Sequence, residues 1–132
     1  MILIDTQVLV WLRSGSSELG RQAANVIERS WASGEVAVSA ITFWEIAMLH
    51  DKGRLTLLKD IGAWRQALMQ EGLVEIAVDG EIGIRSVSLT DFHADPADRI
   101  IVATALAGHQ LVTSDGKILK WRGPLSRLDA RK

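Results

Sequence analysis

The sequence has 132 residues, of which 48% are hydrophobic and 23% charged, and it contains no cysteine. This length and composition suit one ordinary globular domain, so disorder and a fibrous architecture are excluded. The lack of cysteine excludes disulfides, thiolate metal sites and thiol nucleophiles, and a net charge of −1 means that a bound polyanion needs a local basic patch or metal ions.

The N-terminal half of the chain alternates short apolar runs with helical patterns. Residues 1–5 predict a strand closed by a carboxylate, and the apolar spacing over 8–12 predicts a helix directly after it. A second helix is expected after Ser16-Ser17, beginning at Glu18 and ending at Ser33-Gly34, with serine before its start and glycine as its stop. A short strand over 36–38 then leads to a third helix over 42–53. The opening run is too short for a signal peptide or a membrane span, so neither is expected.

The C-terminal half continues the same alternation. A helix is expected over 60–70, a strand over 73–78 and a weaker helix over 79–89, since Gly83 interrupts that pattern. Asp95-Pro96 is a strong helix start, and the sequence after it predicts a helix ending at Gly108, a strand over 110–113, a short helical piece near 118–119, and a break at Gly123-Pro124 before a short apolar tail segment.

Apolar strands separated by helices favour an α/β fold, a three-layer α/β/α sandwich around a mostly parallel sheet of four or five strands. We expect residues 1–132 to form a single domain of this kind. In such sheets ligands bind beyond the carboxyl ends of the strands, so an acid that closes a strand is expected at the functional edge.

Four acids have positions that suit one site. Asp5 and Asp115 each follow a predicted strand, while Glu45 and Asp98 fall in the first turn of predicted helices, where the helix dipole favours anions. If the loops share one sheet edge, these carboxylates converge. Oxygen ligands of this kind suit Mg²⁺ or Mn²⁺, and divalent ions support phosphodiester hydrolysis.

Each acid also has a structural interpretation. Asp5 is placed to cap the helix after it, and Asp115-Gly116 is a turn signal. Glu45 has capping-box spacing from Thr42, and Asp98 has the same spacing from Asp95. Four acids in this order through an α/β chain nevertheless favour one shared site over four unrelated caps.

Several segments together resemble PIN-domain ribonucleases, and among them the VapC-type toxins of bacterial toxin–antitoxin pairs. The resemblance covers nearly the whole chain. The order and spacing of the matching segments are more specific than any one of them: 3–6 with 8–12, 44–47 continuing to 53–55, 93–99 followed by 100–105, and 111–115.

The resemblance implies a metal-dependent acidic site with Asp5 and Asp98 as the foremost Mg²⁺ ligands. Supporting hydroxyls are implied at Thr6 and at Thr113 or Ser114. The full implied set of acids, for catalysis and for metal binding, is Asp5, Glu45, Asp98 and Asp115.

The resemblance also implies partners and a location. It implies cleavage of RNA, a homodimer, inhibition by a cognate VapB-type antitoxin, and a cytoplasmic protein without membrane attachment. The chain departs from relatives at two places, since Gln7 stands where a histidine is frequent and Ala97 where an aromatic residue is frequent.

Other residues have less specific patterns. The last sixteen residues carry six cations and one acid, a tail that suits either phosphate contacts or a solvated, frayed end. Arg99 suits either a carboxylate or phosphate contact or an ion pair within or between helices. His93, close to Asp95, suits either a metal ligand or proton shuttle or, as is more frequent for a lone loop histidine, a local hydrogen-bonding role. The tryptophans are expected chiefly as core or interface anchors, least so Trp121 in the basic tail.

Two other functions compete with the endoribonuclease toxin. A phospho-acceptor signalling domain also places acids at strand ends around Mg²⁺, but here the first strand ends in one acid rather than an acidic pair. A PIN-like module that binds RNA or protein without catalysis would share the same acids, so only a cleavage assay with Mg²⁺ separates it from the enzyme.

Overall fold

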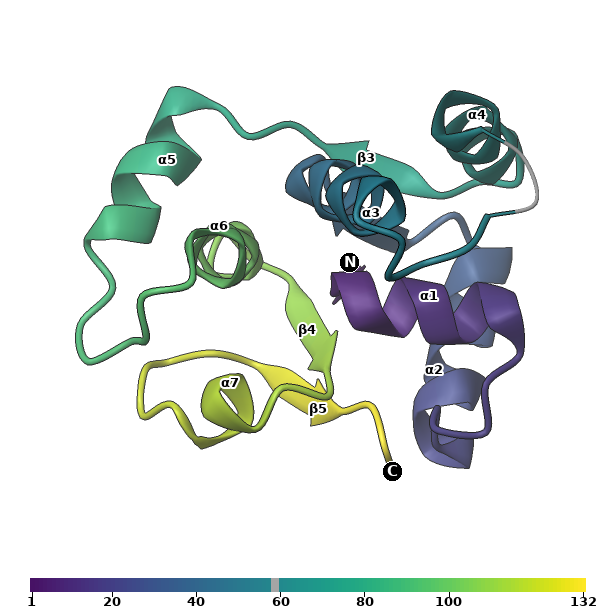
Figure 1. Cartoon of the computed structure of the whole chain (residues 1–132). Helices are drawn as coiled ribbons and strands as arrows, with labels where there is room; N and C mark the ends of the chain where they lie inside the picture. The colour runs from purple at the N-terminus through teal and green to yellow at the C-terminus, as the bar shows by residue number, and fades with distance from the viewer. Residues whose placement is uncertain (58–59) are drawn as a thin grey trace.

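The computed structural model describes residues 1–57 and 60–132, and within them a five-stranded parallel sheet lies between helices (Figure 1). The strand order is β3-β2-β1-β4-β5. In chain order the elements are β1 (Ile2–Ile4), α1 (Thr6–Ser14), α2 (Arg21–Ala32), β2 (Val36–Ser39), α3 (Ile41–Asp51), α4 (Ile61–Gln70), β3 (Val74–Ile76), α5 (Gly80–Val87), α6 (Pro96–Ala105), β4 (Gln110–Thr113), α7 (Gly116–Lys120) and β5 (Arg127–Asp129). The predicted α/β class is confirmed.

Both faces of the sheet are buried, which explains why its central strands are apolar throughout. Ile4 and Val112 belong to a core shared with α1, α2, α3 and α4, while Leu3 and Leu111 belong to a second core shared with α6 and α7. Successive strand residues point to opposite faces, so neighbours such as Leu3 and Ile4 enter different cores. The predicted three layers follow from this alternation.

Aspartate side chains begin five of the helices. Each of these side chains accepts a hydrogen bond from a backbone N–H in the first turn of the helix that follows it. The five residues are Asp5, Asp60, Asp79, Asp95 and Asp115. The side-chain oxygen satisfies a donor that has no partner inside the helix, and such a cap stabilises the fold by about 1 kcal/mol. The cap at Asp79 lets α5 form although Gly83 lies inside it.

The prediction that the second helix begins at Glu18, directly after Ser16-Ser17, is wrong. The Ser16 hydroxyl accepts from the N–H of Glu18 in a turn, and α2 begins only at Arg21. Gly20 fixes this start, because its N–H donates to the Ala130 carbonyl at 2.8 Å and a side chain there would lie 2.2 Å from the carbonyl carbon of Lys132.

The C-terminal tail is not a frayed end. Residues 127–129 form the edge strand β5, which pairs in parallel with β4. The Arg127 guanidinium donates to the carbonyls of Ile118 and Gly123, and Arg131 lies over the ring of Trp11 at 5.3 Å. These two tail cations therefore hold the fold together.

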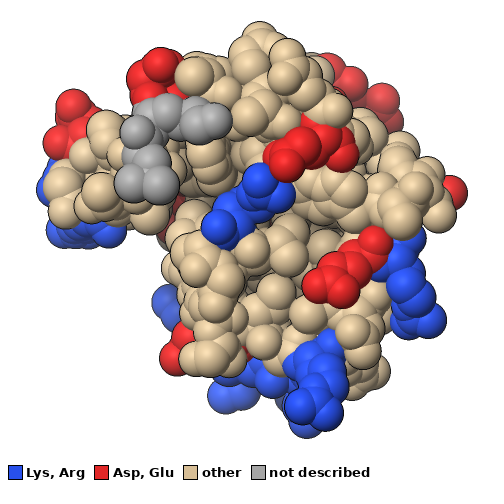
Figure 2. All heavy atoms as spheres, turned by 90° about the vertical axis from the view of Figure 1, so that its right-hand side faces the viewer, with Lys and Arg blue, Asp and Glu red and all other residues tan. Residues whose placement is uncertain are grey.

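The face covered by α1, α2 and α4 carries acidic and basic side chains in mixture (Figure 2). No large cluster of one sign is visible on it. Among the helices in the described ranges, none is long and apolar enough to cross a membrane.

Candidate metal centre

Asp5 leaves the carboxyl end of β1 and is almost entirely buried, with 7% of its surface exposed. One carboxylate oxygen, Oδ1, accepts the Val8 N–H at 2.9 Å, and the other, Oδ2, accepts from the Thr113 hydroxyl. The predicted helix cap is therefore confirmed. The same carboxylate also faces the other acids of this edge, since the charges of Asp98 and Asp115 act on it.

Asp115 follows the neighbouring strand β4 and caps α7. Its Oδ1 accepts the N–H groups of Lys117 and Ile118 at 2.8 and 3.2 Å. Its own N–H donates to the Thr113 hydroxyl at 3.1 Å, and that hydroxyl in turn donates to Asp5. Thr113 thereby links the two acids at the strand ends.

Glu45 lies in the second turn of α3, so the predicted first-turn position is wrong. The helix begins at Ile41, directly after β2, where the Ser39 hydroxyl accepts the Ile41 N–H. The Thr42 capping box is not formed. Instead, Glu45 Oε1 accepts from the Thr6 hydroxyl, which lies 3.1 Å from the Thr42 hydroxyl.

Asp98 lies in the first turn of α6, and its backbone N–H is capped by Asp95 at 3.0 Å. Its carboxylate does not form the reciprocal hydrogen bond to the Asp95 N–H that a capping box requires. Asp98 Oδ2 instead forms a 2.7 Å hydrogen bond with Nε2 of His93. The carboxylate is thus turned away from the helix start and toward the other acids.

His93 is the site residue that sequence reasoning left out. It does have the predicted role of a local hydrogen-bonding residue, but its partner is a site acid, and donor atoms of His93, Asp98 and Asp115 all lie within 4.8 Å of one another. The His93 ring stacks on Phe92 at 4.3 Å, which fixes its plane. The sequence does offer one signal for this role: His93 stands five residues before Asp98, in the loop that leads into the helix carrying that acid.

Among the residues that the structure describes, Arg99 forms no ion pair with a carboxylate, so the expected ion pair is not formed. Its guanidinium donates to the carbonyls of His93, Ser86 and Phe92 at 2.9, 3.0 and 2.7 Å. The planar fork of donors satisfies three carbonyls of the α5–α6 segment at once. Arg99 therefore holds the loop that carries His93.

The predicted supporting hydroxyls differ in their positions. Thr6 and Thr113 are buried and bonded to site acids. Within the described residues the Ser114 hydroxyl forms no hydrogen bond, and only its backbone carbonyl is engaged, by Arg131.

Burial, and after it the charge of neighbouring acids, raises the pKa of three of the site acids. Burial raises the pKa of Asp5 from 3.8 to about 6, the charges of Asp98 and Asp115 add to that rise, and the bonds from Thr113 and Val8 oppose it. Burial, followed by neighbouring acids, also raises the pKa of Glu45 and of Asp98. Crowded carboxylates that resist ionisation are a donor set suited to a divalent cation, which would offset their repulsion.

The chain is similar to known proteins along most of its length. The family model described as PIN domain matches residues 2–123. The chain is 33% identical over 125 residues to Ribonuclease VapC22 of Mycobacterium tuberculosis, covering 93% of each chain.

Solved structures share the fold. A chain of a toxin–antitoxin complex from Klebsiella pneumoniae is 26% identical with a TM-score of 0.67, and 98% of each chain is covered. A chain of VapBC2 from Rickettsia felis, bound to a DNA fragment from the promoter, is 18% identical with a TM-score of 0.68, covering 98% of this chain and 100% of that one.

Proposed function

This chain belongs to the PIN domain family, and we propose that it is a metal-dependent endoribonuclease, the toxin of a toxin–antitoxin pair. The proposal rests chiefly on the group of His93, Asp98 and Asp115, whose ligand atoms lie within 4.8 Å of one another. Asp5 and Glu45 support it, because each has a pKa raised by burial and further by the charge of Asp98. The name of the VapC22 relative supports RNA as the substrate.

We assign the metal to Asp5, Glu45, Asp98 and Asp115, with Mg²⁺ as the ion and Mn²⁺ as its substitute. A divalent ion bound there would activate water and offset the negative charge that develops on the phosphodiester. The protein's contribution is position: the Thr113 and Val8 donors fix the Asp5 carboxylate, the Thr6 hydroxyl fixes Glu45, and His93 fixes Asp98. Carboxylates held in this way need little rearrangement when substrate arrives.

The remaining proposals concern the assembly. We assign residues 1–132 to one nuclease domain, and we propose that the protein forms a homodimer, binds a VapB-type antitoxin, and acts in the cytoplasm. Contact with another protein chain is supported by exposed apolar side chains. Trp44, one residue before Glu45, is 54% exposed, and Ile84 and Val87 on α5 are exposed as well. Size-exclusion chromatography with light scattering tests the dimer.

The catalytic proposal is tested by incubating the purified protein with RNA in Mg²⁺. We expect cleavage that EDTA abolishes and that Asp98→Asn lowers by a factor of about a hundred to a thousand, as expected for loss of one charge-stabilising group. The matched control is Asp51→Asn, which removes an exposed carboxylate at the end of α3.

Full activity of Asp98→Asn would contradict the assignment. Binding of RNA without cleavage by the wild-type protein would instead support the non-catalytic binding module.

A further inference from the structure

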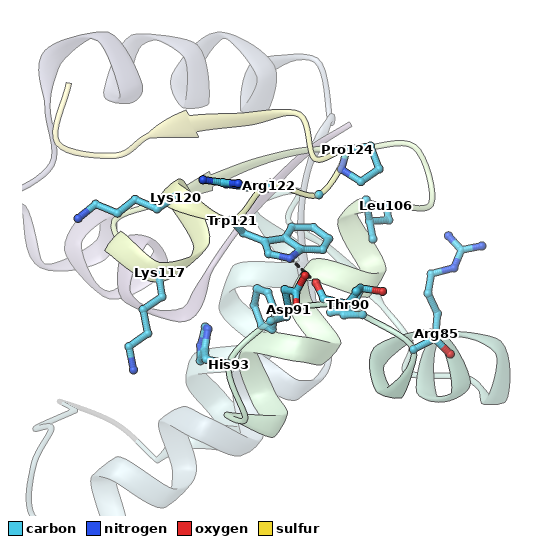
Figure 3. A pocket seen from close by; sticks show the side chains of 14 residues that line it. Arg85, Thr90, Asp91, His93, Leu106, Lys117, Lys120, Trp121, Arg122 and Pro124 are labelled. Atoms are coloured by element: carbon cyan, nitrogen blue, oxygen red, sulfur yellow. Dashed lines mark hydrogen bonds between the residues drawn. The ribbon is translucent and has the colours of Figure 1, made fainter.

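A cavity of about 950 Å³ lies beside the acidic cluster, between the segment that joins α5 to α6 and the segment that follows α7 (Figure 3). Phe92, Trp121, Leu89 and Leu106 give it an apolar wall. Its size is that of cavities that hold small organic ligands.

The cavity is joined to the acidic cluster through two residues. His93 lines it and also bonds Asp98 through Nε2. Lys117 lines it as well, and its backbone N–H donates to Asp115. In Figure 3 the Lys117 side chain extends from α7 toward the end of the cavity where His93 lies. The cavity and the acids Asp98 and Asp115 therefore share a border.

The aromatic wall is fixed before any ligand arrives. The Trp121 indole N–H donates to the Thr90 carbonyl at 2.9 Å, and its ring meets Phe92 edge-on at 5.4 Å. Gly123 lies against the same ring, where a side chain would come within 2.1 Å of it. Because these side chains are already fixed, they lose little conformational entropy when a ligand binds, and this loss does not weaken the affinity for the ligand.

The charged residues that line the cavity are mostly cations, although the whole chain carries a net charge of −1. Arg85, Lys117, Lys120 and Arg122 line it, and Asp91 is the one acid among its lining residues. Arg85 lies 3.7 Å from Glu81, whereas no ion pair within residues 1–57 and 60–132 involves the other three cations. Unpaired cations around an aromatic wall are the combination that binds a nucleotide, with phosphate on the cations and base on the rings.

We propose that this cavity binds a nucleotide of single-stranded RNA adjacent to the bond that is cut, its base against Trp121 and its two flanking phosphates at Lys117 and Arg122. The proposal deepens the ribonuclease function and rests on it. Single-stranded RNA is chosen because the bases of a duplex are stacked and not free to enter a cavity.

The test measures binding without cleavage. A fluorescent single-stranded RNA oligonucleotide is titrated in EDTA with the Asp98→Asn protein, and fluorescence anisotropy gives Kd. Adding Lys117→Ala and Arg122→Ala should raise Kd about tenfold and lower the slope of log Kd against log salt by about 1.4, the value for two phosphate contacts on a single strand. The matched control is Arg21→Ala with Arg29→Ala, which removes equal charge from exposed positions of α2, beyond the sheet.

A second measurement needs no cavity variant to fold. In the Asp98→Asn protein, the NMR signal of the Trp121 indole N–H, assigned by triple-resonance experiments, should shift on addition of RNA, while that of Trp31 should not. The proposal is overturned if the control pair Arg21→Ala, Arg29→Ala loses as much affinity as the cavity pair Lys117→Ala, Arg122→Ala. It is also overturned if the Trp121 signal does not move.

The outcome is separable from that of the proposed function. RNA binding at the cavity with no cleavage by the wild-type protein would refute the enzyme and leave the cavity as an RNA site. Cleavage by the wild type together with unchanged binding in the cavity variants would refute the cavity alone and leave that surface to a protein partner.

Discussion

The acidic cluster has an inner half and an outer half that are held differently. In the inner half, Asp5 and Glu45 accept hydrogen bonds from threonine hydroxyls on other elements. In the outer half, Asp98 and Asp115 are half-buried and lie with His93 beside the basic cavity. The inner acids are thus held by hydroxyl donors from other elements, whereas the outer acids form, with His93, the group whose ligand atoms lie close enough together to hold a metal ion.

The strongest test of the inner half is the pH dependence of stability without metal. Asp5 has a pKa of about 6 in the fold against 3.8 ordinarily, so between these values the folded protein holds a proton that the unfolded chain has released. Stability should therefore fall as pH rises from about 4 to about 6 and then level off, with Asp5 contributing roughly 3 kcal/mol. Urea unfolding in EDTA across this range measures the fall.

The Asp5→Asn variant isolates that contribution. It should lose most of this pH dependence and be more stable than the wild type at pH 7.5 when no metal is present. An unchanged slope in this variant would show that Asp5 is not the group responsible, and would remove the contrast between the two halves.

Metal binding should need both halves. Adding Mg²⁺ or Mn²⁺ in hundredfold excess over Kd should stabilise the wild type by about 2.7 kcal/mol, which raises Tm by several degrees. Asp5→Asn and Asp98→Asn should each reduce this gain, and the double variant should abolish it. Differential scanning calorimetry with EDTA as the reference measures it.

If one of the two single variants kept the full gain in Tm, the ion would belong to the other half alone.

The smallest expected effect concerns His93, which orients an outer acid. His93→Ala should weaken Mn²⁺ affinity by roughly tenfold, as removal of a residue that orients a metal ligand commonly does. His93→Gln, which keeps a side-chain N–H donor for Asp98, should recover part of the loss. Isothermal titration calorimetry measures both, with His50→Gln at the exposed end of α3 as the control. Equal losses in the alanine and glutamine variants would argue against a role in orienting Asp98.

The sequence by itself determined the local features of the fold. Apolar runs ending in an acid predicted β1 and β4, and aspartate caps and Asp95-Pro96 predicted helix starts, because these signals depend on residues within one turn of each other. Asp5 and Asp115 follow β1 and β4, which are adjacent parallel strands. Where a start depended on a distant segment, as at Gly20 against the C-terminal residues, the prediction was wrong.

Only the tertiary structure decided which atoms meet. Thr113 reaches Asp5 across 108 residues of chain and Thr6 reaches Glu45 across 39, contacts set by strand order and helix packing. The same packing turned Asp98 toward His93, directed Arg99 to three loop carbonyls and left a basic cavity beside the acids. Hydrogen bonds of a few ångströms depend on how whole elements are placed, and no pattern within one element records that placement.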